Sequence, residues 1–240
     1  MDMVEKRSIR MFFDPMYFIF LLPGLILAGI ASLLVKTTFG RYSHVRCYSG
    51  MTGAQAALRM MQGNGVYDVK VEETQGFLSD HYDPANKVLR LSPGVYESNS
   101  LAAVGVACHE AGHALQHASQ YAPLALRTML VPVTNFSSMF AFYVVAAGFL
   151  FRPLLYVGCA LFAVAFVFAL VTLPVEWDAS SRAKQHIVMA GVVSPGQERD
   201  AGRVLNAAFL TYLAAAVSSL MTLLYYLMRA GVIGGGRDRD

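Results

Sequence analysis

The chain has 240 residues, of which 55% are hydrophobic and only 15% charged, and its mean hydropathy is +0.45. Soluble globular chains carry about 25% charged residues, so this composition excludes an ordinary soluble domain. The net charge of +3 is too small to indicate nucleic-acid binding, and no Lys/Arg cluster with interleaved aromatic residues supports that partner. The sequence therefore predicts a protein that contacts the lipid bilayer and binds no nucleic acid.

Four apolar blocks are long enough to cross a membrane, because a transmembrane helix needs about 20 apolar residues. They cover about 17–35, 129–151, 154–173 and 207–227. Only two residues separate the middle blocks, which predicts a tight helical hairpin. The first block could instead be a cleaved signal peptide. It is longer than the usual apolar core of about 7–15 residues and no small-x-small site follows it, so we expect an uncleaved span.

These spans divide the chain into five parts and predict a mainly α membrane protein with a small α+β domain at the membrane surface. The parts are an N-terminal tail and first span (1–35), an α+β region (36–128), a transmembrane hairpin (129–173), a helical segment (174–206), and a fourth span with a polar tail (207–240).

The first polar stretch contains signals for helices and strands. Thr52 can cap a helix over 53–62, which Gly63 ends. Alternation over 66–73 weakly predicts a strand, and 87–91 predicts a second short strand. An extended peptide substrate could pair with an exposed edge of the strand 87–91, although an ordinary sheet strand is equally favoured.

A longer helix should follow, from Leu101 to about Gln120, with Ser98, Asn99 or Ser100 as its cap. The second polar stretch predicts two helices broken at 194–196. Two membrane crossings separate the two polar stretches, so both must lie on the same side of the membrane. One site can therefore use residues from both.

The run His109-Glu110-Ala111-Gly112-His113 carries a zinc motif on the helix. His109 and His113 are four positions apart and share a helix face, so both imidazoles can bind one ion. Glu110 can reach a metal-bound water and act as its general base. Small residues at 111 and 112 would let another element pack closely. The alternative is a helix with two ordinary surface histidines, but a chance HExxH should occur only about once in two hundred such sequences.

A catalytic zinc site needs a third protein ligand from elsewhere in the chain. The position that metzincins require is Ser119, and His117 is rotated by about 80° from His109. We expect His117 to be a supporting or surface residue. Glu176 is the favoured third ligand, against the alternative of a solvated acid at a helix start. Asp178 could instead bind the metal or accept the outer N–H of a ligand histidine.

Several segments together resemble the YugP-type membrane zinc metallopeptidases of bacteria, over about 14–227. They are 80–84 (DHYDP), 89–96 (LRLSPGVY), 102–117 (AAVGVACHEAGHALQH), 174–180 (PVEWDAS) and 203–208 (RVLNAA). The resemblance implies a neutral zinc peptidase of the bacterial cytoplasmic membrane, related to the HtpX and CAAX-prenyl membrane proteases. In those relatives an Asp follows the Glu ligand by four residues. Glu176 matches the ligand, whereas the later position is Ser180, with Asp178 as a possible substitute.

The leading interpretation is a membrane-bound zinc endopeptidase that hydrolyses peptide bonds in membrane or unfolded proteins. A site-2-type protease needs an Asp in a later span, which is missing, and a di-iron enzyme needs about eight histidines where this chain has six. A non-catalytic membrane scaffold or partner-binding subunit that keeps a zinc site has no need of Glu110.

Three cysteines lie far apart without a CxxC pair, which predicts free thiols rather than a disulfide framework. Lys and Arg are evenly distributed between the two sides of the spans, so they set no orientation. Free Cys47 and Cys108 favour a reducing, cytoplasmic active site.

Overall fold

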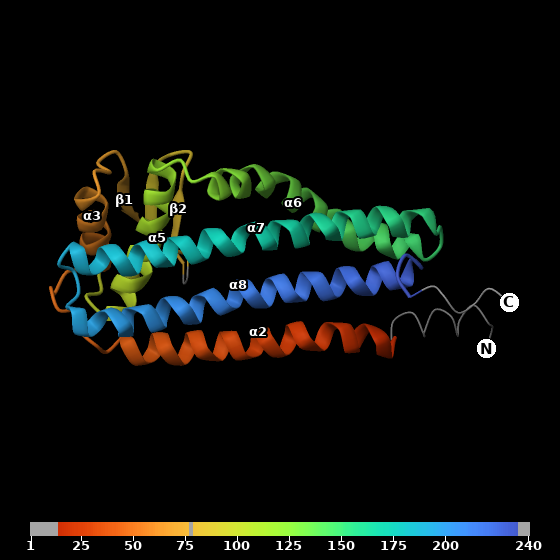
Figure 1. Ribbon diagram of the computed structural model, residues 1–240, viewed down its shortest axis with the longest axis horizontal. Coiled ribbons are helices and arrows are strands. Elements are labelled where there is room, and N and C mark those ends of the chain that lie inside the picture. Colours follow the sequence, from red (N-terminus) through yellow and green to blue (C-terminus); the bar gives the residue numbers. More distant parts are fainter. Residues whose placement is uncertain (1–13, 77–78, 235–240) are drawn as a thin grey trace. The chain divides into compact units, whose positions relative to one another are not determined.

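The computed structural model describes residues 14–76 and 79–234 (Figure 1). Within that part of the chain, four helices are long and apolar enough to cross a membrane. They are α2 (Pro15–Tyr42), α6 (Ala122–Gly148), α7 (Pro153–Met189) and α8 (Pro195–Arg229). A small three-stranded sheet accompanies them. The expected class, a mainly α membrane protein with a small α+β domain, is confirmed.

The long helices extend beyond the predicted spans. α7 continues through Pro174 to Met189, and α8 already begins at Pro195. The two helices expected in the second polar stretch are therefore the end of α7 and the beginning of α8. Hydropathy detects only the apolar part of such a helix, and Pro174 removes one backbone hydrogen bond without ending α7. Gly191, at φ +68°, lies in the turn that joins them.

The chain forms two compact units. The first contains residues up to Ile30, Met129–Leu170 and residues from Leu213 onward. Its helices approach closely at small residues: a Cβ on Gly24 would lie 2.3 Å from Ser218 Oγ, and one on Gly158 would lie 2.2 Å from a Val145 methyl group. Such contacts are typical of packed membrane helices, where small residues let backbones approach.

The second unit contains Ala31–Thr128 and Val171–Tyr212. Its sheet has the order β1-β3-β2, with β1 (Lys70–Glu73) parallel and β2 (His81–Asp83) antiparallel to β3 (Val88–Leu91). The prediction that β3 could offer a free edge to a substrate is wrong, because β3 is paired on both sides. β2 was not predicted, since three residues are too few to show a period of two.

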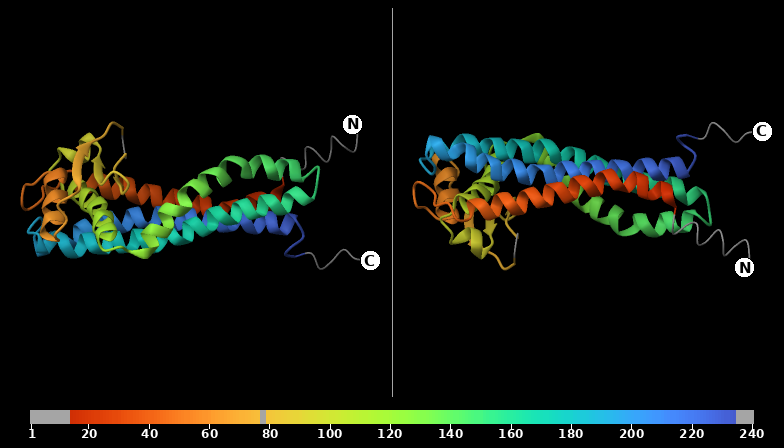
Figure 2. Two further views of the ribbon diagram at one scale, coloured as in Figure 1. Left: turned by 90° about the horizontal axis from the view of Figure 1, so that it is seen from above. Right: turned by 90° about the horizontal axis from the view of Figure 1, so that it is seen from below.

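Shorter helices pack around this sheet, near the turn where α7 ends and α8 begins (Figure 2). α3 (Gly53–Gly63) has the expected Thr52 cap, and Gln55 completes a capping box. A short helix α4 (Pro93–Tyr96) precedes α5 (Leu101–Ala118), whose cap is Ser100. Gly53 has no side chain, and this lets α3 pack tightly on α4. A Cβ at this position would lie only 2.2 Å from the Val95 carbonyl oxygen. Buried side chains of α3, the sheet and α5 form one core that holds α5 in place.

All three cysteines are free, as the sequence predicts, and the structure shows that all three are buried.

Candidate metal centre

α5 places the two motif histidines side by side. The His109 and His113 rings face each other edge to face, with centroids 4.9 Å apart. His113 is buried, and the His109 side chain is 12% exposed. One face of α5 therefore presents two imidazoles toward the same point, as expected for positions i and i+4.

α7 brings Glu176 to that point. Its Oε2 atom lies 3.1 Å from His109 Nε2 and 3.7 Å from His113 Nε2. The carboxylate is 1% exposed, so it is not the solvated helix-start acid considered as the alternative. One potential ligand atom from each of the three residues lies within 4.8 Å of the others. Two imidazoles and one carboxylate match the donor set of a zinc site with three protein ligands.

The backbones of α5 and α7 approach unusually closely beside these residues. A Cβ on Gly112 would lie 2.5 Å from the Ala179 carbonyl oxygen, closer than real Cβ atoms come. Ala179 at this contact and Ala111 beside Gly112 in sequence are both fully buried. The small residues inside the motif therefore allow α7 to carry Glu176 to the histidines.

The outer nitrogens of both histidines have partners. His109 Nδ1 lies 3.1 Å from Ser180 Oγ, and His113 Nδ1 lies 2.9 Å from Gln116 Oε1. An amide oxygen can only accept, so His113 carries its proton on Nδ1 and keeps the Nε2 lone pair for a ligand bond. Ser180, the position at which the resemblance to HtpX and CAAX-prenyl proteases implied an Asp, therefore contacts His109 directly.

Asp178 contacts neither histidine directly, in contrast to the two roles that the sequence analysis considered; it contacts Gln116 instead. Its Oδ2 atom accepts hydrogen bonds from Gln116 Nε2 at 2.9 Å and from Arg182 Nε at 2.6 Å. Gln116 also donates to the Val175 carbonyl oxygen at 2.7 Å. Asp178 therefore orients His113 through Gln116, which the sequence analysis missed because a glutamine has no distinctive spacing.

Arg127 is a further residue that the sequence analysis missed. Its Nη1 atom lies 3.2 Å from Glu176 Oε1, the carboxylate oxygen that faces away from the histidines. Tyr212 of α8 also lies near the Glu176 and Glu110 carboxylates, and its hydroxyl interacts with Glu176. In sequence, Arg127 is a single cation before an apolar block and is indistinguishable from a membrane-interface anchor.

Glu110, the acidic residue of the motif, does not belong to the cluster of His109, His113 and Glu176. Burial raises its pKa to about 7, while the neighbouring His109 acts to lower it and Glu176 and Asp80 act to raise it. A carboxylate with a pKa near neutrality is suited to exchange protons with a substrate at physiological pH.

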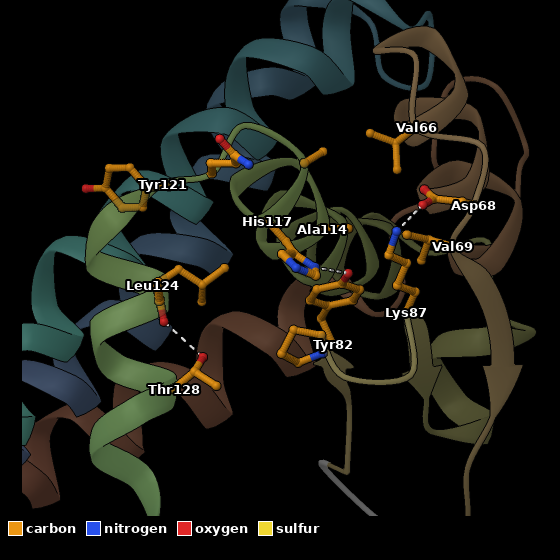
Figure 3. A pocket seen from close by; sticks show the side chains of 14 residues that line it. Val66, Asp68, Val69, Tyr82, Lys87, Ala114, His117, Tyr121, Leu124 and Thr128 are labelled. Carbon is orange, nitrogen blue, oxygen red and sulfur yellow. Dashed lines mark hydrogen bonds and ion pairs between the residues drawn. The ribbon is translucent and has the colours of Figure 1, made fainter.

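A cavity of about 790 Å³ lies beside α5, the helix that carries His109 and His113 (Figure 3). α5 contributes Ala114 and His117 to it, and α6 contributes Leu124 and Thr128. Across the cavity, Asp68 and Lys87 form an ion pair. His117 does not belong to the histidine and carboxylate cluster; its Nδ1 atom lies 2.8 Å from the Tyr82 hydroxyl.

The side chains of His109, His113 and Glu176 do not line this cavity, but two of its lining residues are sequence neighbours of residues at the cluster. Ala114 directly follows His113 on α5, and Thr128 directly follows Arg127 on α6. Four apolar helices long enough to cross a membrane and a His–His–Glu cluster that could hold a metal are the features expected of a membrane metallopeptidase.

Comparison with known proteins agrees with that class. Residues 17–231 match the family described as "Putative neutral zinc metallopeptidase", and the chain belongs to this family. It is 46% identical over 228 residues to the "Putative membrane protease YugP" of Bacillus subtilis (strain 168), covering 94% of this chain and 100% of that relative. No solved structure matches the chain. The protein is therefore an integral membrane member of a zinc metallopeptidase family.

Proposed function

We propose that the chain is a gluzincin-like zinc endopeptidase in which His109, His113 and Glu176 hold the metal and Glu110 is the catalytic base. The observation that carries this proposal is the convergence of two α5 imidazoles and a buried α7 carboxylate within 4.8 Å. Glu110 directly follows His109 on α5, and its carboxyl group is close enough to His109 and Glu176 for both to shift its pKa. A purely structural metal site would have no use for this fourth group.

When bound, zinc would act as a Lewis acid that polarises the substrate carbonyl and lowers the pKa of water to near neutrality. Glu110 then accepts a proton from the attacking water and returns it to the leaving amide nitrogen. Ser180 and Gln116 keep both histidine rings oriented through their outer nitrogens. The hydrogen-bonded ring of His113 leaves its Nε2 atom unprotonated, as ligation requires.

The proposed substrate is an extended segment of a membrane or unfolded protein, with one side chain in the cavity beside α5. β2 is an edge strand, and its Tyr82 lines the cavity, so a peptide paired with β2 would lie along the cavity wall. The wall includes Val66, Val69 and Leu124, which favour an apolar side chain. The charged Asp68–Lys87 pair lies at the rim.

The sequence arrangement supports further parts of this proposal. The segments 36–128 and 174–206 together form the catalytic region on one side of the membrane, and 1–35, 129–173 and 207–240 supply the spans. We place the protein in the bacterial cytoplasmic membrane with the active site on the cytoplasmic side, where the buried thiols of Cys47 and Cys108 stay reduced.

The test compares the full-length protein with a Glu110→Gln variant in detergent micelles, using unfolded casein as the substrate. We expect one zinc per chain in both proteins. Cleavage by the variant should fall by a factor of about 10²–10⁴, as expected when general-base catalysis is lost. Undiminished cleavage would remove Glu110 from the mechanism. Equal zinc content with no cleavage by either protein would favour the scaffold alternative.

A further inference from the structure

A second hollow lies on the second unit (Ala31–Thr128 and Val171–Tyr212), and His109, His113 and Glu176 do not line it. It has a volume of about 840 Å³ and is lined by α2, α7 and α8. Arg41 and Leu34 lie on the α2 side, Arg203 and Leu210 on the α8 side, and Trp177 on α7. We call this hollow the three-helix groove.

The three-helix groove is apolar at one end and basic at the other. Leu34 precedes Arg41 by seven positions on α2, and Leu210 follows Arg203 by seven positions on α8. Seven helical residues span about 10 Å, and both helices change from leucine to arginine over that distance. Since α2 and α8 both line the groove, the two changes form its apolar and basic ends.

The basic end carries an excess of positive charge. Within the described part of the chain, Arg41 forms no ion pair, and its guanidinium lies over the Tyr42 ring at 5.6 Å. Arg203 pairs with Asp200 at 2.8 Å, yet its side chain remains 54% exposed. Lys184 adds a third cation beside the lining residues, over the Trp177 ring and 3.4 Å from Asn206 Oδ1. The described lining residues include no Asp or Glu.

The apolar end is suited to hydrocarbon. Trp177 is 55% exposed and packs edge to face on Phe209, with ring centroids 5.2 Å apart. Exposed Trp side chains favour the boundary between hydrocarbon and headgroups. Boundaries of the predicted spans lie near residues 35, 173 and 207. The residues of α2, α7 and α8 that line the groove are close to these boundaries in sequence.

We propose that the three-helix groove binds a glycerophospholipid with an anionic headgroup. Its phosphate lies between Arg41 and Arg203, and an acyl chain lies along Leu34 and Leu210. A soluble anion would use only the basic end, whereas a neutral lipid would not need the excess charge. This binding site is independent of the proposed peptidase activity.

The test measures lipid binding by native mass spectrometry of the full chain in micelles, with phosphatidylglycerol, phosphatidylcholine or inorganic phosphate added. We expect one phosphatidylglycerol to bind at least tenfold more tightly than phosphatidylcholine. Arg41→Gln should weaken that binding about fivefold, and Arg41→Gln with Arg203→Gln about 25-fold, as expected for removing basic contacts to an anionic lipid. Arg59→Gln on α3, an exposed arginine outside the groove, should leave it unchanged.

Arg203 also contacts Tyr42 and Asp200, so the double variant could fold poorly. Arg41→Gln removes no ion pair described here and tests the proposal by itself. Equal affinity for the two lipids, unchanged binding by Arg41→Gln, or phosphate binding as tight as that of phosphatidylglycerol would each overturn the assignment.

Discussion

The two carboxylate oxygens of Glu176 have different partners, and these partners bear on how the proposed third ligand is oriented. Oε2 faces both histidine Nε2 atoms, while Oε1 faces Arg127 at 3.2 Å. A carboxylate buried among apolar side chains is costly unless it is paired. Arg127 supplies that pairing without occupying the oxygen that faces the histidines, so it orients Glu176 for ligation by one oxygen.

Replacing Arg127 should therefore weaken the metal site. We expect Arg127→Gln to lower zinc affinity about 10–100-fold, as changes to groups that orient a ligand usually do. Arg127→Lys should recover part of the loss because it restores the charge without the planar guanidinium. Competition with a chromophoric chelator would measure the affinity, with Arg59→Gln as the control. If all three variants bind zinc equally, Arg127 does not position Glu176.

The proposed ligand Glu176 and the more distant Asp178 should also differ in their effects. Glu176→Gln is expected to lose zinc almost completely, because a site with two protein ligands is weak. Asp178→Asn should cost only about 10–100-fold, since Asp178 reaches His113 through Gln116. Zinc content after dialysis, measured by atomic absorption, checks this order. The reverse order would make Asp178 the ligand.

At the scale of elements, the contact between α5 and α7 sets the size of the metal centre. Gly112 lets the two backbones meet at a point where any side chain would overlap Ala179. The packing of the two backbones therefore helps to fix the distance between the histidines and Glu176, in addition to the contacts among those three side chains. Gly105 provides a natural comparison on the same helix, because its Cβ would come no nearer than 3.9 Å to the Ala201 carbonyl oxygen.

We expect Gly112→Ala to destabilise the protein by about 1–3 kcal/mol through overpacking and to reduce zinc binding. Gly105→Ala should be neutral or stabilise it by up to about 1 kcal/mol, because alanine favours the helix. Thermal unfolding in micelles and zinc titration would measure both effects. Equal behaviour of the two variants would show that the contact with Ala179 yields without cost.

The same elements show what can be predicted from sequence. Long apolar blocks and the Thr52 cap depend on neighbouring residues, so both were predicted. Counting membrane crossings put Glu176 on the same side as the two histidines, and its position just after an apolar block made it the favoured third ligand. The central place of β3 and the partners Ser180 and Gln116 depend on how elements dock in three dimensions. No local periodicity carries that information, and a three-residue strand such as β2 has too little pattern to detect.

For the whole molecule, the proposed site requires both polar stretches to face one compartment. Zinc–ligand bonds of about 2.0–2.2 Å cannot join residues across a hydrocarbon layer of about 30 Å. In a background lacking the native cysteines, single cysteines at Ser79 and Gly196 should react together with a reagent that cannot cross the membrane. Cysteines at Arg152 and Gly234 should form the opposite pair. Reaction of positions 79 and 196 from different sides would contradict the topology and the proposed site.

The separation of the proposed ligands along the chain also has a consequence for biosynthesis. Glu176 comes 67 residues after His109, and the α6–α7 hairpin lies between the two polar stretches. A nascent chain therefore exposes both histidines before the third ligand exists, and Glu176 can join them only after the hairpin has returned to their side of the membrane. Metal capture would then report that two spans have inserted correctly. On this basis a partly synthesised chain would not cleave peptides. Hydrolysis would begin only in a molecule whose α6–α7 hairpin has been inserted correctly.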